Sequence, residues 1–513
     1  MNWKRYKTYF QDNKPDESHF ITGIDLGDDS SALAFYNVLR GQSEIMDPSG
    51  GYGRASVPTM MQYASKSKEW IFGEYAMLNK GVGAEITLVS LMEKLGRKEF
   101  IDLDGKAARV ATVLGMYLKE LIGGLKNINP KAEVAGIVAC IPNYMDEAAK
   151  DELKWAFKAA GCDGELVCLA SDRECALTAY FAASKPRSEL LLLLDYGARE
   201  LRGGVYQIDP AANYIDVAAK SVMLDKSLGA SQIDKELVKL FLESFPKEVS
   251  KQEMEQLSSF LYQHKDFLLQ NSWKKPVKLY FNFVYPPLQC SITQERMRAL
   301  IKPFEESFEK FISNLLSINA DNTPISKNDI STVACVGGGF EMQWVKDSIA
   351  RLLPKSRVVF FKHSKGALAE GAALICAKKL EILDSPSVIV ADQLRLTEDY
   401  GIAVRANRKE VFVPVVNRGS FWWEQNSKLF FIVNQPVKNG MTLPLFRRDQ
   451  NGEVRHMETM RLEGLPDRPR GVTKLKLDMR FEGIHTLKAK IADCGFGEMY
   501  PKSDYEKTVE IYV

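Results

Sequence analysis

The sequence predicts an α/β fold with a largely parallel core sheet, followed by a separate domain built of strands. Two copies of one strand-and-turn pattern and a regular alternation of strand and helix patterns indicate the α/β part. Strand patterns dominate after residue 392 and indicate the second part. We therefore expect a first domain of residues 1–383, a linker of residues 384–392 and a β domain of residues 393–513.

The repeated unit is an apolar strand that ends in Asp-x-Gly. In the clearer copy, Leu190–Leu194 leads into Asp195 and Gly197, and in the other copy a shorter run ends in Asp25 and Gly27. Two carboxylates facing each other across a cleft can hold a hydrated divalent cation, and glycine turns let backbone N–H groups approach phosphate. The pair predicts a nucleoside triphosphate site, although Asp-x-Gly after an apolar run is also a common turn.

A third apolar strand runs into three glycines, Gly337, Gly338 and Gly339. Glycines remove Cβ atoms where a flat ring or a phosphate must lie close to the backbone. Ligands of mainly parallel sheets bind at the carboxyl ends of the strands, and Asp172 is expected at the same edge. The three loops together predict one cleft.

In their order along the chain, these motifs resemble the actin, sugar-kinase and heat-shock ATPase superfamily, and within it the DnaK-type seventy-kilodalton heat-shock chaperones. Gly23–Gly27 resembles the first phosphate loop of that family, Asp225–Gly229 its Asp-x-x-Leu-Gly-Gly motif, and Val336–Gly339 its adenosine loop. Leu462–Val472 is very similar to the Pro-Arg-Gly-Val segment of its peptide-binding domain. The resemblance implies a duplicated actin-like ATPase fold with helical lobes and a C-terminal β-sandwich.

The resemblance also implies ligands and site residues. ATP or ADP with magnesium would be the cofactors, and a peptide or protein client would be the partner. Candidate catalytic residues are Asp25, Asp172 and Asp195, of which Asp25 and Asp195 would hold the hydrated magnesium. Candidate nucleotide-binding residues are Gly27, Asp28, Gly197, Arg199, Gly229, Gly337, Gly338 and Gly339.

The β domain carries a second candidate site at Phe421, Trp422 and Trp423, near the expected peptide groove. Aromatic side chains anchor extended peptides well, but core packing of the sandwich is the favoured role for at least one of the two tryptophans. The run Val388–Asp392 resembles the hydrophobic interdomain linker of the family, or it is a short edge strand. The family continues into a helical lid beyond the position of Val513, so we expect a lidless domain with fast peptide exchange.

The departures from the family pattern lie in the predicted cleft. Asp28 and Asp29 replace two threonines of the first loop, and Ala198, Arg199 and Glu200 replace two glycines and a threonine of the second. Carboxylates only accept hydrogen bonds, and a like charge at ~4 Å costs on the order of 4 kcal/mol at an effective dielectric constant of about 20. We expect Arg199 to pair with Asp28, Asp25 or Asp195, or else to lie on the surface.

Composition narrows the function classes further. A formal charge of +2 provides no reason to expect nucleic acid or an anionic membrane as a partner. The eight cysteines contain no C-x-x-C pair, and the five histidines lack the spacing of zinc ligands. With no secretory signal pattern at the start, we expect a cytoplasmic protein.

The favoured interpretation is a chaperone-like protein in which ATP hydrolysis is weak or lost. The alternatives are a fully active ATP-dependent peptide-binding chaperone and a nucleotide-independent scaffold. A sugar kinase would share the two Asp-x-Gly loops but leaves the segment Leu462–Val472 unexplained. The sequence leaves the client and the oligomeric state open.

Overall fold

The chain forms two compact units in a computed structural model of the protein. The first comprises residues 1–217, 226–318 and 324–390, and the second comprises residues 218–225, 319–323 and 391–513. The structure describes all residues except 1–2, 13–17, 50, 65, 83–85, 104, 144, 246–247, 271–272, 274, 318–323, 392–395, 397, 407–408, 419–427, 450–451, 484–485 and 513. Among the described residues, no helix has the length and apolar character needed to span a bilayer.

The first sheet of the first unit is centred on the strand that carries Asp25. Its order is β11-β10-β1-β2-β3, with β1 parallel to β10, β10 parallel to β11, and β2 antiparallel to both β1 and β3. The strands are β1 (His19–Leu26), β2 (Ser30–Asn37), β3 (Gln42–Ile45), β10 (Glu133–Ile141) and β11 (Val167–Ser171). The short β4 (Val57–Pro58) pairs with β2.

The second sheet of this unit is centred on the strand that carries Asp195. Along β18-β17-β12-β13-β14, β12 is parallel to β17, β17 is parallel to β18, and β13 is antiparallel to β12. The strands are β12 (Glu189–Tyr196), β13 (Leu201–Pro210), β14 (Tyr214–Asp225), β17 (Thr332–Val336) and β18 (Arg357–Phe360). The run that the sequence left open as linker or edge strand contains β19 (Ser387–Ala391), which pairs with β14.

Helices cover these sheets, and two glycines permit the closest packing. The helix α10 (Ala367–Lys379) lies against β1 and against α5 (Asp172–Ala183). A Cβ atom at Gly23 would lie well under 3.0 Å from the Ala369 carbonyl oxygen, and one at Gly371 equally close to the Cys175 carbonyl oxygen. Side-chain atoms at these two positions would therefore push α10 away from its neighbours. The helices α3 (Val110–Gly123) and α4 (Glu147–Ala159) complete a large apolar core with β1 and β10.

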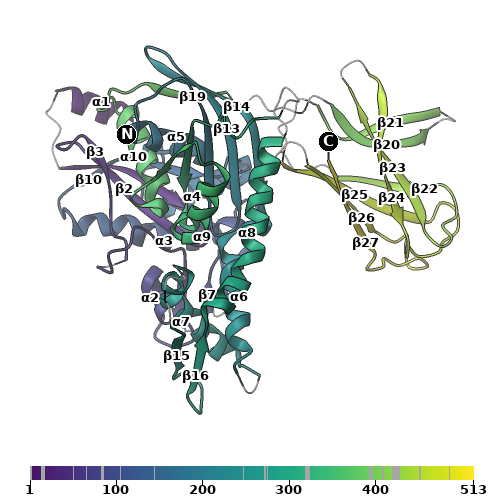
Figure 1. Cartoon of the computed structure of the whole chain (residues 1–513), viewed down its shortest axis with the longest axis horizontal. Coiled ribbons are helices and arrows are strands. Elements are labelled where there is room, and N and C mark those ends of the chain that lie inside the picture. Colours follow the sequence, from purple (N-terminus) through teal and green to yellow (C-terminus); the bar gives the residue numbers. More distant parts are fainter. Residues whose placement is uncertain are drawn as a thin grey trace. The chain divides into compact units, whose positions relative to one another are not determined.

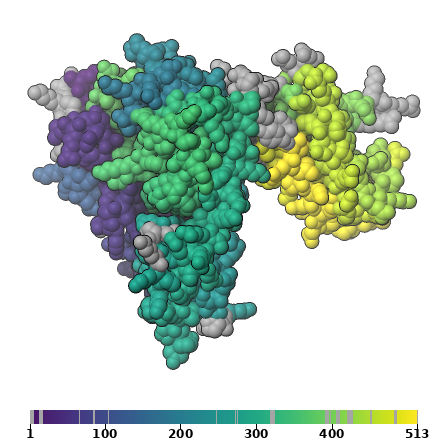
Figure 2. All heavy atoms as spheres, in the orientation of Figure 1, coloured from purple at the N-terminus to yellow at the C-terminus, as the bar shows by residue number. Residues whose placement is uncertain are grey.

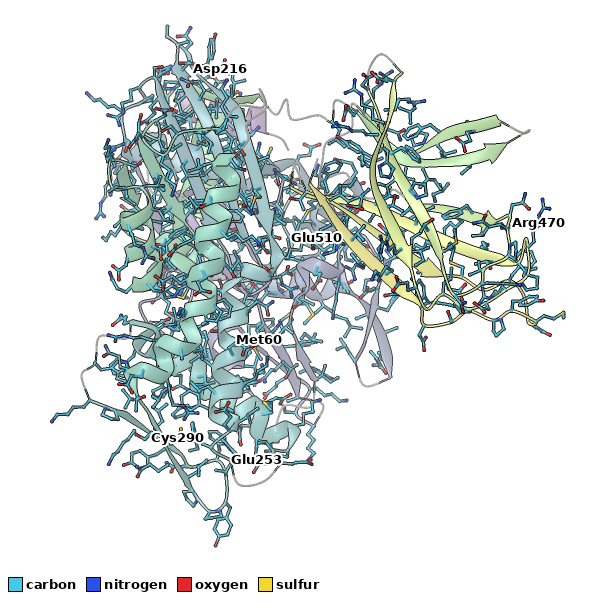
Figure 3. The ribbon with its side chains drawn as sticks, turned by 45° about the vertical axis from the view of Figure 1, so that its right-hand side comes forward. Met60, Asp216, Glu253, Cys290, Arg470 and Glu510 are labelled. Atoms are coloured by element: carbon cyan, nitrogen blue, oxygen red, sulfur yellow. The ribbon has the colours of Figure 1, made fainter. Side chains whose placement is uncertain are left out.

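The remaining elements of the first unit form a helical region beside the second sheet (Figure 1). In Figure 2, teal and green atoms from these later segments form much of the surface of this unit. Figure 3 shows Glu253 and Cys290 at one end of the unit and Asp216 at the opposite end. The elements are α6 (Ala230–Leu242), α7 (Lys251–Gln270), β15 (Val277–Phe281), β16 (Leu288–Ile292), α8 (Gln294–Ser317) and α9 (Gln343–Leu352).

Smaller elements surround these cores. They are α1 (Trp3–Asp12), β5 (Met61–Ala64), β6 (Glu69–Phe72), α2 (Gly73–Leu78), β7 (Ile86–Leu88), β8 (Phe100–Leu103), β9 (Lys106–Arg109) and the 3-10 turns η1 (Met92–Lys94), η2 (Gly124–Asn127), η3 (Gly164–Leu166), η4 (Lys226–Leu228), η5 (Gly338–Glu341) and η6 (Ser364–Gly366). The turn η1 matters for function, because it lies beside the loop that follows β1 and contacts it through Asp28.

The second unit consists of antiparallel strands. One sheet has the order β21-β20-β23-β24, and the other contains β22-β25-β26-β27. The strands are β20 (Asp399–Ala406), β21 (Lys409–Val416), β22 (Lys428–Val433), β23 (Met441–Arg448), β24 (Val454–Leu462), β25 (Thr473–Gly483), β26 (Thr486–Asp493) and β27 (Glu506–Tyr512). The predicted combination of a mixed α/β part with a β part is thus observed.

Strand β25 shows why alternation predicts a half-buried sheet. Leu475, Leu477 and Met479 are fully buried, whereas Lys476 and Asp478 between them are half-buried and Lys474 and Arg480 at either end are exposed. Successive side chains of a strand point to opposite faces, so one face packs into the core and the other meets solvent.

Candidate functional site

The two Asp-x-Gly turns have the same local structure. The Gly27 N–H donates to the Ser30 carbonyl at 3.1 Å, and the Gly197 N–H donates to the Glu200 carbonyl at 3.0 Å. Each bond closes a tight connection between two antiparallel strands, β1 with β2 and β12 with β13. Both glycine N–H groups therefore bind within their own turns.

Arg202 is the cation at the centre of a cluster of acids, Asp172, Asp195 and Glu200, and the sequence analysis missed it. It lies on β13 directly opposite Asp195 of β12. Its guanidinium contacts the Asp172 carboxylate, lies 3.7 Å from Asp195 Oδ2, and donates from Nε to Glu200 Oε1 at 2.6 Å. Antiparallel pairing about the Gly197 turn places these two side chains opposite each other, so the hairpin register could have revealed Arg202 in the sequence.

Burial and crowding of carboxyl groups control the charge of this cluster. Burial raises the pKa of Asp25 to about 7, and the positive charge of Arg202 opposes that rise. Burial also raises the pKa of Asp195 to about 8, with further increases from the charges of Asp25 and Glu200. One guanidinium thus serves several acids, and burial favours the protonated forms of Asp25 and Asp195.

Arg199 joins three segments of the first unit. Its Nε lies 3.3 Å from Asp28 Oδ2, its Nη1 lies 2.5 Å from Glu93 Oε2, and its Nη2 contacts Ser90 Oγ. The Asp28 carboxylate also accepts the Glu93 N–H at 2.9 Å. Of the three acids that the sequence proposed for Arg199, the structure pairs it with Asp28, while Arg202 lies beside Asp195.

Gly229 allows the second turn to approach the start of α6. A Cβ atom at Gly229 would lie well under 3.0 Å from the backbone of Arg199. The first helix N–H groups donate to this turn, from Ala230 to the Gly197 carbonyl at 3.0 Å and from Ser231 to the Ala198 carbonyl at 2.8 Å. Donors that commonly bind an anion at a helix N-terminus therefore bind protein carbonyls here.

The three glycines after β17 make room for atoms of the protein itself. Gly337 has φ of +93°, and a Cβ atom there would lie 2.6 Å from the Tyr196 carbonyl oxygen. The Tyr196 ring fills the corresponding space at Gly339, and the Lys365 side chain fills it at Gly338. Close packing explains these glycines without a bound ring.

The second candidate site is the aromatic group of the β domain. Phe421, Trp422 and Trp423 lie outside the described residues. The motif Leu462–Val472 is described, and its Arg468 makes a bidentate ion pair with Asp493 at 2.7 and 2.8 Å. Both side chains are buried, so this motif residue has a structural role.

The residues of the cleft do not fit a magnesium nucleotide. A guanidinium already lies among Asp172, Asp195 and Glu200, and burial favours the protonated forms of Asp25 and Asp195. Magnesium usually keeps several waters and is held by one or two carboxylates together with substrate phosphates, and a neighbouring guanidinium and protonated carboxyl groups disfavour such a cation. Within the described ranges, no three His, Cys, Asp or Glu side chains are grouped so that they could hold a metal ion.

Two family models match parts of the chain. Residues 45–251 match a family of unknown function (DUF5716), C-terminal part, and residues 395–513 match a domain of unknown function (DUF8552). The first match lies in the α/β region and leaves residues 1–44 and 252–394 uncovered, and the second lies in the β region.

The chain is also similar over most of its length to curated proteins named chaperone protein DnaK. The identity is 23% over 506 residues for Thermosipho melanesiensis, which covers 94% of this chain and 79% of that protein. For Thermotoga maritima the identity is 24% over 503 residues, which covers 94% of this chain and 80% of that protein. For Cenarchaeum symbiosum the identity is 22% over 495 residues, which covers 92% of this chain and 71% of that protein. The chain is thus a distant relative of the DnaK chaperones.

Proposed function

We propose that this protein is a chaperone-like protein that binds a peptide or protein client and in which ATP hydrolysis is weak or lost. The observation that carries the proposal is Arg202, whose guanidinium lies among Asp172, Asp195 and Glu200. The distant relationship to DnaK extends along both units and supports the chaperone-like part. The ion pairs of the cleft support the loss of hydrolysis, because they occupy the acids that a magnesium nucleotide would need.

In this proposal, residues 1–383 form a duplicated actin-like fold, residues 384–392 a linker, and residues 393–513 a peptide-binding-like β-sandwich. The two sheets of the first unit support the duplication, because β1 and β12 each lie between a parallel and an antiparallel neighbour. The two antiparallel sheets of the second unit support the sandwich. Asp25, Asp172 and Asp195 then stabilise a closed cleft instead of holding a metal.

The charges at the turn after β1 also oppose nucleotide binding. Asp28 is bound by Arg199 and by the Glu93 N–H, and burial raises its pKa while Arg199 opposes the rise. A polyphosphate placed at this turn would meet a carboxylate that is already engaged. Displacing the carboxylate would break an ion pair and a hydrogen bond before any contact with phosphate could form.

Titration calorimetry of the full chain with ATP and magnesium tests the proposal, followed by a single-turnover assay. We expect little or no heat of binding and no turnover above the rate without protein. Tight magnesium-dependent binding with turnover would instead support an active ATP-dependent chaperone. A variant with Asp195→Ala is the control: an active enzyme would lose turnover, whereas the proposed protein would change only in stability.

Client binding needs its own measurement. We expect the protein to slow the aggregation of a chemically unfolded model protein, to the same extent with and without ATP. Replacing Trp422 and Trp423 by alanine should weaken this effect if the predicted aromatic groove binds the client. No effect of the unmodified protein on aggregation would favour the scaffold alternative, in which the chain binds one fixed partner.

A further inference from the structure

Strand β22 presents two large apolar side chains on the outer face of its sheet. Phe430 is 55% exposed and Ile432 is 50% exposed. Their neighbours Leu429 and Phe431 lie opposite Leu477 and Leu475 of β25, which are fully buried. Because side chains alternate along a strand, Phe430 and Ile432 belong to the face that points away from the core.

Lysine side chains surround these two apolar groups. Lys476 lies opposite Phe430 and Lys474 lies opposite Ile432 in the pairing of β22 with β25. The Lys474 Nζ is 5.6 Å from the centre of the Phe430 ring, and Lys428 is the exposed first residue of β22. We call Lys428, Phe430, Ile432, Lys474 and Lys476 the outer patch.

The acids of this sheet lie mainly at its far edge. Glu506 and Glu510 of β27 pair with Lys490 and Lys488 of β26, at 2.6 and 3.3 Å. One acid lies among the outer-patch residues: Asp478 is opposite Lys428 in the pairing of β22 with β25 and lies 4.0 Å from Lys476, so three lysines face one aspartate there. The charge of this face is therefore positive next to β22 and balanced farther away.

The edge of β22 can accept another strand. Among the strands that the structure describes, β22 pairs with β25 alone. A sheet edge exposes unpaired backbone groups, and proteins usually protect such edges with charges, prolines or bulges on the edge strand. The sequence of β22 contains no proline, and its exposed centre is apolar. Such an edge is suited to pairing with an extended segment of another chain.

The charges decide between two kinds of partner. A second copy of this chain paired through the same edge would place a second group of lysines on the same side of the joined sheet and would supply no acid opposite the first group, and like charges at an interface cost energy. An acidic segment would meet the lysines with opposite charge and could place apolar side chains on Phe430 and Ile432. We infer that the outer patch binds an extended acidic segment of a partner protein, which adds as a strand beside β22.

Fluorescence anisotropy with two labelled peptides tests this inference on the full chain. In one peptide every second residue is threonine and the residues between are alternately glutamate and valine, so that one face of the strand carries both kinds of side chain. The other peptide has lysine in place of glutamate. We expect only the glutamate peptide to bind, and we expect its affinity to fall as salt is raised, because exposed charges are screened. Equal binding of both peptides, or binding of neither, would overturn the inference.

Two variants locate the binding. The double variants K474E/K476E and F430S/I432S should each weaken binding of the glutamate peptide by about tenfold or more. Phe430 and Ile432 are about half exposed, so we expect F430S/I432S to melt at the same temperature as the unmodified protein. An unchanged melting temperature would show that the variant is folded. Val411→Ser is the matched control, since Val411 is 44% exposed on the edge strand β21 of the other sheet. This variant should bind the glutamate peptide as tightly as the unmodified protein does.

Sedimentation velocity tests whether a second copy of this chain occupies the outer patch instead of an acidic segment. The inference expects the sedimentation of the unmodified protein and of F430S/I432S to be the same. If the unmodified protein is a dimer that F430S/I432S abolishes, a second copy covers the outer patch and the inference is wrong. Unchanged peptide binding in both double variants would also contradict it.

Discussion

Replacing Arg202 with methionine tests the interpretation of the cleft most directly. Methionine keeps a long side chain but removes the charge that Asp172, Asp195 and Glu200 share. At the observed 3.7 Å from Asp195, a unit charge pair is worth on the order of 4 kcal/mol at an effective dielectric constant of about 20. Removing one partner of a buried ion pair costs about 3 to 5 kcal/mol.

We expect R202M to lower the free energy of unfolding by about 3 kcal/mol, at the low end of this range. The reason is that Arg202 is 24% exposed and that burial favours the protonated form of Asp195. The difference in the free energy of unfolding between R202M and the unmodified protein should become smaller as the pH falls, because protonated acids carry no negative charge for a cation to balance. Millimolar magnesium should recover part of the stability of R202M and little of that of the unmodified protein, because a cation can then enter among the unpaired acids.

Hydrogen exchange at the amides of β12 and β13 is the suitable assay, since it reports the stability of the first unit separately. Arg199→Met is the matched control, because Arg199 is more exposed, at 39%, and its replacement should cost about 1 kcal/mol or less. A loss below about 0.5 kcal/mol for R202M, or losses that are equal in the two variants, would refute the central role of Arg202.

Two other predictions concern packing and acid stability. Gly23→Ala and Gly371→Ala should each lower the free energy of unfolding by about 3 kcal/mol in urea titrations, because the new Cβ would meet backbone atoms. Gly123→Ala should instead be neutral or stabilising, since no atom lies within 4 Å of its Cβ position. Although burial alone would raise it, hydrogen bonds led by Arg468 lower the pKa of Asp493 to about 2. This shift contributes about 2 kcal/mol above pH ~4, and the contribution disappears as the pH falls to about 2. Asp493→Asn should remove that pH dependence in hydrogen exchange of β26, and an unchanged acid profile would contradict the assignment.

The candidate site shows which contacts a sequence pattern can predict. An ion pair between Arg199 and Asp28 was among the expectations, because both residues follow glycine turns that were expected to face each other. Arg202 was missed because it lies within a strand pattern, although its position opposite Asp195 follows from the hairpin register about the Gly197 turn. The glycines at 337–339 were expected to let a flat ring or a phosphate lie close to the backbone, and the sequence could not show that Tyr196 and Lys365 of the chain itself lie close to these glycines.

Local patterns in the sequence determine the elements of this protein. Apolar runs ended by Asp-x-Gly specify β1 and β12 with their turns, and the alternation of lysine and apolar residues specifies the half-buried β25, because these features depend only on neighbours along the chain. The tertiary structure alone decided that Arg202 meets Asp172 and that Arg199 meets Glu93. Those pairs join residues far apart in the sequence, and their contact energies depend on strand register and burial, which no local pattern encodes.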